Sequence, residues 1–241
     1  MHPADFYTGL VADLYRPLRA HSFDPAPYRA FIQGSGQPAL ELGCGDGDPL
    51  LALRAAGLDV EGVDSSADML DRCRRNAARA GLDVVLHHQR MEALDLPRRY
   101  RSIFLAGPTF TLLADDDTAL RALTGIRTHL ADGGTALVPL FLPAPTPAGQ
   151  IGRVREARDE DGAVLRFSVL AEERDEAARS QRTLARYERR TGAGDTVLER
   201  PWILHWYTRD QFRALAAAAG LDVVAIRDAA PDEFTVVLAR T

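Results

Sequence analysis

The sequence predicts an α/β fold in which helices cover both faces of a mainly parallel sheet. Apolar segments of strand length alternate with segments of helical length up to about residue 140, and the alternation resumes after residue 208. Such alternation places successive strands side by side, with helices as their connections. Two further observations are a glycine-rich turn after the first strand and an acidic residue at the end of the second. The 241 residues, 46% of them hydrophobic, suffice for a sizeable core.

The positions of strands and helices follow from the apolar periodicity and from the residues that interrupt it. Thr208 and Gln211 have the spacing of a capping box, in which each side chain bonds the other residue's backbone amide. Strands are expected near residues 38–43, 58–63, 83–87, 102–106, 134–141, 221–227 and 234–239. Helices are expected from Ser66 to Gly81, from Asp116 to Asp132-Gly133-Gly134, and from Thr208 to Gly220.

The first strand and its turn read Ala-Leu-Glu-Leu-Gly-Cys-Gly-Asp-Gly over residues 39–47. Glycine tolerates positive φ and lets a ligand touch the backbone, so the three glycines predict a binding turn. A tight connection without a ligand would also use glycine, so the turn alone is a weak signal. We expect Asp48 to cap a helix whose first residue is Pro49.

Asp64 stands at the carboxyl end of the second strand, about 20 residues after the first glycine of the turn. In an α/β nucleotide-binding fold, an acid at this place holds the two hydroxyls of a ribose. The alternative is that Asp64 merely caps the helix that starts near Ser66. The turn and the acid together predict a nucleotide-like cofactor.

The segment from Glu41 to Gly47 fits the pattern E-x-G-x-G-x-G and resembles motif I of the class I S-adenosylmethionine-dependent methyltransferases. The resemblance implies S-adenosyl-L-methionine (SAM) as cofactor and S-adenosyl-L-homocysteine (SAH) as product. It also implies a Rossmann-like sheet of seven strands with the last strand antiparallel, and it casts Asp64 as the ligand of the ribose hydroxyls. A nicotinamide dehydrogenase more usually has G-x-G-x-x-G, so the glycine spacing favours SAM over NAD.

A second stretch, Gln89-Arg90-Met91-Glu92, falls where this family lines the adenine ring. The family often has an Asp immediately before the apolar residue, whereas this chain has Arg90. Met91 is suited to pack on the adenine face or to belong to the core under the sheet, and Glu92 could reach the adenine amine. The cofactor set implied by the resemblance is Tyr7, Glu41, Gly43, Cys44, Gly45, Gly47, Asp64, Ser65, Met69, Arg90, Met91 and Glu92.

Composition argues against several classes of function. The net charge of -5 and the pI of about 5.7 give no general basic surface for nucleic acid. The segment Gly107-Pro108-Thr109-Phe110 lacks the Asn-Pro-Pro-Tyr-like run with which base methyltransferases stack a flipped base. All 29 basic side chains are arginine, which excludes a lysine Schiff base, a lysine general base and a Walker A lysine.

The cysteine count and the hydropathy pattern bear on location. Two cysteines, Cys44 and Cys73, cannot build a disulfide framework, which favours a reducing, cytoplasmic setting. No segment approaches 18 uninterrupted apolar residues and the N-terminus lacks an apolar signal region, so we expect neither export nor membrane insertion. No Cys, His and Asp group has the spacing of a metal site, so no metal is expected.

Two segments lie outside the repeating α/β pattern, which itself covers residues 36–140 and 208–241. Residues 1–35 carry apolar residues at helical spacing, and in related enzymes such a helix forms a lid over the cofactor. Residues 141–207 begin with a proline-rich linker and continue as about four antiparallel strands. We expect this inserted sheet either to cover the substrate site or to form a dimer interface.

Methyl transfer requires alignment of the sulfonium with a nucleophile and removal of any acidic proton from that nucleophile. His205 is the first candidate for a base, because strand alternation places it on one face with Tyr207. A structural hydrogen bond within the sheet is the alternative role for His205. Tyr15 is the third catalytic candidate, although Tyr7 and Tyr15 could also be half-buried packing residues.

The sequence therefore predicts a SAM-dependent methyltransferase with a small-molecule acceptor, such as a secondary metabolite or a sugar-like compound, in which N, O or C is methylated. One alternative is a protein of the same fold that binds SAM without transferring its methyl group. A less favoured alternative is an NAD-dependent oxidoreductase. Protein methylation is not excluded by these residues, and a homodimer is possible.

Overall fold

The computed structural model, which describes all residues except 1–5, 20–22, 160, 193 and 241, is built around a seven-stranded sheet. Its strands are β1 (Ala39–Leu42), β2 (Val60–Asp64), β3 (Leu86–His88), β4 (Tyr100–Leu105), β5 (Leu130–Phe141), β10 (Leu221–Ala230) and β11 (Glu233–Arg240). They lie in the order β10-β11-β5-β4-β1-β2-β3. Neighbours among β1 to β5 pair in parallel, whereas β11 runs antiparallel to β5 and β10. The predicted seven-stranded sheet with an antiparallel last strand is thus confirmed.

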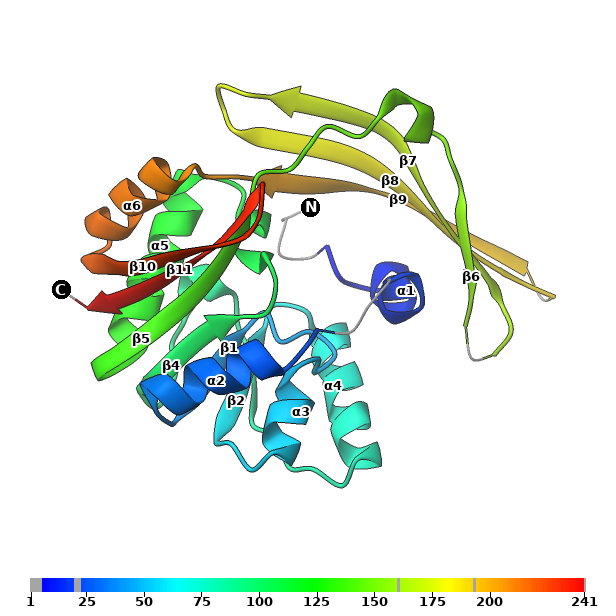
Figure 1. Cartoon of the computed structure of the whole chain (residues 1–241). Coiled ribbons are helices and arrows are strands. Elements are labelled where there is room, and N and C mark those ends of the chain that lie inside the picture. Colours follow the sequence, from blue (N-terminus) through cyan, green and yellow to red (C-terminus); the bar gives the residue numbers. More distant parts are fainter. Residues whose placement is uncertain (1–5, 20–22, 160, 193, 241) are drawn as a thin grey trace.

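Helices cover both faces of this sheet (Figure 1). One face packs against α2 (Ala26–Ser35), α3 (Leu50–Ala55) and α4 (Ala67–Arg79), which bury residues such as Ile32, Leu53 and Leu70. The other face packs against α5 (Asp116–His129) and α6 (Arg209–Ala218), whose Leu123 and Phe212 are fully buried. The two separate cores on the two faces are what a doubly covered parallel sheet requires.

Two predicted helix starts are confirmed by their capping bonds. The Ser66 hydroxyl accepts a hydrogen bond from the Met69 amide at 3.2 Å, so Ser66 caps α4. Thr208 and Gln211 form the complete capping box at the start of α6.

Two other predicted boundaries are wrong. Helix α3 begins at Leu50 without a side-chain cap, because Asp48 instead accepts hydrogen bonds from the Phe23 amide and the Arg19 guanidinium. Helix α5 ends at His129 and the chain enters β5 at once. The segment Asp132-Gly133-Gly134 therefore lies inside the strand, where the register with β4 shifts and Gly133 has a φ of 69°.

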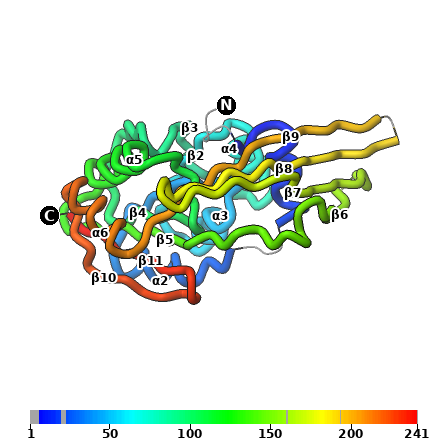
Figure 2. The backbone as a smooth tube through the Cα atoms, turned by 90° about the horizontal axis from the view of Figure 1, so that it is seen from above, coloured from blue at the N-terminus to red at the C-terminus, as the bar shows by residue number. Residues whose placement is uncertain are grey.

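A second sheet is inserted between β5 and α6. Its antiparallel strands are β6 (Arg155–Arg158), β7 (Val164–Asp175), β8 (Ser180–Thr191) and β9 (Gly194–His205), in that spatial order. Helix α1 (Leu10–Leu18) lies between this sheet and the larger one, and the views in Figures 1 and 2 agree on this arrangement. Val11 and Leu14 of α1 pack with Leu165, Ala185 and Tyr187 on the inner face of the inserted sheet.

The outer face of the inserted sheet is charged. Strand alternation places Arg166, Arg186 and Glu188 opposite to the buried inner residues. Arg166 of β7 pairs with Glu156 of β6 at 2.9 Å, and Arg186 of β8 pairs with Glu199 of β9 at 3.5 Å. Such cross-strand ion pairs suit a surface in contact with water.

Candidate active site

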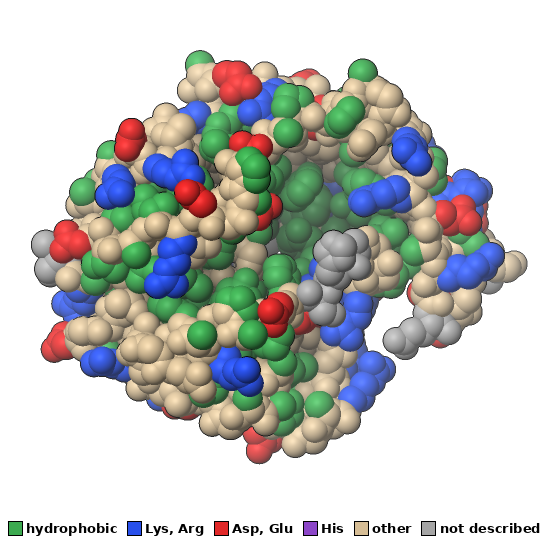
Figure 3. Space-filling view, in the orientation of Figure 1, with side chains coloured by type: hydrophobic (Ala, Val, Ile, Leu, Met, Phe, Trp, Pro, Cys, Tyr) green, Lys and Arg blue, Asp and Glu red, His purple; other side chains and the backbone are tan. Residues whose placement is uncertain are grey.

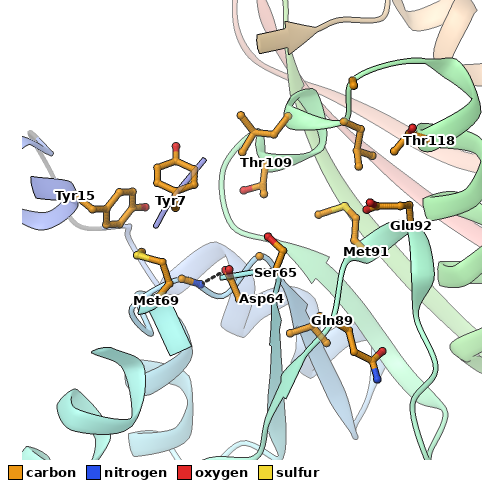
Figure 4. A pocket seen from close by; sticks show the side chains of 16 residues that line it. Tyr7, Tyr15, Asp64, Ser65, Met69, Gln89, Met91, Glu92, Thr109 and Thr118 are labelled. Carbon is orange, nitrogen blue, oxygen red and sulfur yellow. Dashed lines mark hydrogen bonds between the residues drawn. The ribbon is translucent and has the colours of Figure 1, made fainter. Parts of the chain in front are cut away.

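A cavity opens at the carboxyl ends of β1, β2 and β4, the edge of the sheet at which α/β folds bind ligands. Figure 3 shows a hollow with apolar side chains between the two sheets, and Figure 4 shows the cavity at close range. The cavity is lined by Tyr7, Tyr15, Gly43, Gly45, Val63, Asp64, Ser65, Met69, Gln89, Met91, Glu92, Thr109, Leu112, Leu113, Ala114 and Thr118. These residues come from the N-terminal segment, from the carboxyl ends of β1, β2, β3 and β4 and the turns that follow them, and from the first turns of α4 and α5.

The three glycines of the turn have different reasons to be glycine. All three have positive φ: 73° at Gly43, 53° at Gly45 and 96° at Gly47. Gly43 and Gly45 line the cavity, and a Cβ on Gly43 would lie 2.7 Å from Cγ2 of Thr109. A Cβ on Gly47 would lie 2.8 Å from the sulfur of Cys73, so Gly47 is required by helix packing rather than by the cavity. The turn exposes backbone to a ligand at its first two glycines.

The carboxylate of Asp64 bonds both to the glycine turn and to the residue that precedes α4. Its Oδ2 accepts a hydrogen bond from the Gly45 amide and its Oδ1 accepts one from the Ser66 amide, both at 2.8 Å. Burial raises the pKa of Asp64, and these two amides oppose that shift. Ser66 rather than Asp64 caps α4, so Asp64 is left to face the cavity, as Figure 4 shows.

Glu41 is fully buried beneath the turn and does not line the cavity. Neither of its carboxyl oxygens has a hydrogen-bond partner. Burial raises the pKa of Glu41 well above the usual value, and the nearby Asp48, Asp64 and Asp46 raise it further. Glu41 therefore keeps its proton to a higher pH than an ordinary glutamate does. Cys44, also buried, packs against Gly62 and does not line the cavity either.

Tyr7 and Tyr15 stand side by side on one wall of the cavity (Figure 4). Their ring centroids are 5.3 Å apart in an edge-to-face arrangement. The Tyr15 hydroxyl accepts a hydrogen bond from Arg19 Nη1 at 3.2 Å, which leaves its own proton free to be donated. Burial raises the pKa of both tyrosines, so both are neutral hydrogen-bonding groups at neutral pH.

Met91 and Glu92 lie on the wall opposite the tyrosines, and Gln89 lines the same end of the cavity. Met91 also packs against the apolar core, so its core role is confirmed, while its packing on adenine stays a prediction. Arg90 precedes the short helix η2 (Met91–Ala93) and does not line the cavity.

His205 and Tyr207 do not line the cavity. They contact each other edge-to-face with centroids 5.0 Å apart, and His205 Nε2 bonds Oδ1 of Asp116 at 3.0 Å. His205 thus makes the structural hydrogen bond that was its alternative role. Tyr207 is buried with no hydrogen bond of normal geometry, and burial together with Asp116 raises its pKa.

Several lining residues were not predicted. They are Val63, Thr109, Leu112, Leu113, Ala114 and Thr118, and most of them follow β4. The rule that ligands bind at the carboxyl ends of parallel strands points to this stretch. Its apolar and hydroxyl side chains carry no signature of their own.

Within the described ranges, no group of three His, Cys, Asp or Glu side chains could hold a metal ion. None of the helices that the structure describes is long and apolar enough to cross a membrane.

Comparisons with known proteins agree with this geometry. Residues 39–134 match a family model described as a methyltransferase domain. The dTDP-3-amino-3,6-dideoxy-alpha-D-glucopyranose N,N-dimethyltransferase of Streptomyces fradiae is 29% identical over 234 residues, which cover 92% of this chain and 87% of that protein.

Solved structures extend the similarity to nearly the whole chain. The CcbJ methyltransferase from Streptomyces caelestis is 26% identical, with a TM-score of 0.76 and coverage of 99% of both chains. The sugar N-methyltransferase KedS8 from Streptoalloteichus is 21% identical, with a TM-score of 0.75 over 97% of this chain and 94% of that one. The methyltransferase domain over residues 39–134, the Streptomyces fradiae relative and the CcbJ structure together support a class I SAM-dependent methyltransferase, so this chain is an enzyme that transfers a methyl group from SAM to a small molecule.

Proposed function

We propose that the acceptor is an amino group on a sugar-like small molecule, so that the reaction is an N-methylation. The observation that carries this proposal is the chemistry of the cavity wall, because the described lining residues include no histidine and no cysteine. A neutral amine is already a nucleophile, whereas a hydroxyl or a carbon acid must lose a proton to a base. The Streptomyces fradiae relative, named for methylation of an amino sugar, supports the same class of acceptor.

In this proposal the cofactor occupies the end of the cavity formed by the glycine turn, Asp64 and Met91. The carboxylate of Asp64 binds the ribose hydroxyls, and Met91 packs on the adenine with Glu92 near its amine. When bound, SAM supplies an electrophilic methyl group on a positively charged sulfur.

Tyr7 and Tyr15 act as neutral orienting groups in this proposal. Their raised pKa values keep their hydroxyls protonated, so they bond the acceptor rather than remove its proton. The Arg19 bond to Tyr15 fixes the direction of that hydroxyl. Catalysis then comes mainly from alignment of the amine with the methyl group.

The acceptor approaches from the hollow beneath the inserted sheet. A second cavity there is lined by polar and aromatic side chains that include Gln181, Thr183 and Trp202. Phe6 stacks on Trp202 with centroids 6.2 Å apart, and its neighbour Tyr7 lines the first cavity. Residues 1–35 would then act as the lid and residues 141–207 as the cover of the acceptor site.

The test is turnover with a matched pair of nucleotide sugars, one with an amino group and one with a hydroxyl at the same carbon. We expect SAH and an N-methylated product from the amino sugar alone. Methylation of the hydroxyl compound alone would contradict the N-methylation. SAM binding without turnover of any acceptor would favour the alternative of a SAM-binding protein that transfers no methyl group.

Assembly and location stay predictions. The inner face of the inserted sheet already packs on α1 and its outer face carries ion pairs, which supports a cover rather than a dimer interface. A homodimer would use another surface, and light scattering of the purified protein decides its presence. A cytoplasmic location without nucleic-acid or membrane partners fits the two free, buried cysteines and the net charge of -5. Cell fractionation tests the location.

A further inference from the structure

Asp116 lies at the junction between the inserted sheet and the wall of the cavity. It is the first residue of α5, and its carboxylate meets two groups of the inserted sheet. Arg179 Nη2 donates to Oδ2 at 2.5 Å, and His205 Nε2 bonds Oδ1 at 3.0 Å. Arg179 lies in the turn between β7 and β8, and His205 ends β9.

The two partners are much less exposed than Asp116. The side chains of Arg179 and His205 are 17% and 5% exposed, whereas that of Asp116 is 54% exposed. Burial alone would raise the pKa of Asp116, but bonds from His205 and Arg179 hold it below its usual value, so Asp116 is ionised at neutral pH. Removal of this carboxylate would leave a largely buried guanidinium and a buried imidazole without their acceptor.

Arg179 is held in an unfavourable backbone conformation. Its φ is 52°, and no other non-glycine residue within the described ranges has a positive φ. Its guanidinium also lies 5.0 Å from the ring centroid of Tyr207, and its carbonyl accepts the Trp206 amide at 3.1 Å. Glycine would fit this turn position better, so a contact of the arginine side chain accounts for its presence.

The residues on either side of Asp116 in the sequence line the cavity. Leu112, Leu113 and Ala114, which precede α5, line the cavity, as does Thr118 in its first turn. Asp115 caps the helix by accepting the Thr118 amide at 2.8 Å. A constraint on Asp116 therefore fixes the wall formed by residues 112–118.

We propose that Asp116 is a positioning residue: by binding Arg179 and His205 it joins the inserted sheet to the cavity wall and so preserves the shape of the site that binds the acceptor. The inference rests on the proposed function, in which the acceptor lies between these two parts. It assigns His205 a role through Asp116 rather than contact with the substrate.

The kinetic test compares Asp116→Asn with Asp117→Asn, which removes an exposed acid from the same first turn and so controls for the helix dipole. For Asp116→Asn we expect the acceptor KM to rise about tenfold, with kcat and the SAM dissociation constant within about twofold of wild type. Arg179→Gly suits the positive φ and should give the same rise in KM without a lower melting temperature, while Arg179→Lys should recover most of the affinity. Equal KM values for Asp116→Asn and Asp117→Asn would overturn the proposal, as would a parallel rise in the SAM dissociation constant.

Hydrogen exchange tests, without any acceptor, whether Asp116 links the inserted sheet to the cavity wall. In Asp116→Asn, amides of residues 112–118 and the Trp206 amide should exchange about tenfold faster than in Asp117→Asn. Equal exchange rates of these amides in the two variants would overturn the proposal that Asp116 makes this link. If exchange is faster in Asp116→Asn but the wild-type protein methylates no amine, the link between the inserted sheet and the cavity wall stands, and the N-methylation proposed for the cavity is rejected.

Discussion

At the scale of single residues, Asp64 gives the sharpest test of the cofactor site. Asp64→Ala should weaken SAM binding by about 1–3 kcal/mol, because charge-assisted hydrogen bonds to the ribose hydroxyls would be lost. Asp64→Asn keeps one of the two acceptor oxygens, so it removes the charge but retains one of the two bonds to the backbone amides. Calorimetric titration measures the affinity, with the exposed Asp83→Ala as control. An unchanged dissociation constant in Asp64→Ala would reject the ribose role.

Glu41 makes the stability of the ligand-free enzyme depend on pH. Its pKa in the folded state is raised above the ordinary value of 4.5, so its contribution to stability is complete below that value and is lost as pH rises toward the folded pKa. Glu41→Gln stays neutral throughout. Its melting temperature relative to wild type should therefore rise between about pH 4.5 and pH 8, by at least about 3 °C. A difference that is constant with pH would show that Glu41 ionises normally in the folded protein.

At the scale of elements, the N-terminal segment depends on one arginine of β9. Arg200 Nη1 bonds the Phe6 carbonyl at 2.5 Å and the Thr8 carbonyl and hydroxyl, both at 3.0 Å. These bonds hold the segment that brings Tyr7 to the cavity.

Arg200→Ala should therefore free the segment, weaken SAM binding about tenfold and speed proteolysis near the N-terminus. Arg190→Ala, on the same sheet, is the matched control because its guanidinium pairs with Glu188 and Asp195 instead. If the two variants have equal affinity for SAM and equal rates of proteolysis, Arg200 does not hold the N-terminal segment in place.

The elements most visible in the sequence were those set by local signals. Ser66 and the Thr208–Gln211 pair predict helix starts because their capping bonds lie within one turn. The prediction that Asp48 caps a helix fails because its hydrogen-bond partners, Arg19 and Phe23, lie more than twenty residues away in the sequence and replace the local cap. The glycines at 133 and 134 mark an irregular strand rather than a helix end, since the β4 pairing decides the register.

At the scale of the whole molecule, the fold and the cavity lining beside the glycine turn could be predicted, whereas the lining that follows β4 could not. The turn and Asp64 are adjacent in neighbouring strands, so chain topology brings them together. Strand alternation places His205 and Tyr207 on the same face of the inserted sheet, but it does not predict which residues that face contacts. The partner of His205, Asp116, is distant in sequence, and only the docking of the two sheets brings them into contact.

The central claim is that the cavity at the end of β1 and β2 is a SAM site, and calorimetric titration of the wild-type protein with SAM, SAH and NAD tests it most directly. We expect micromolar binding of SAM and SAH, corresponding to about -8 kcal/mol, and no heat from NAD. Binding of NAD alone would contradict the assignment of the cavity and the reaction proposed for it.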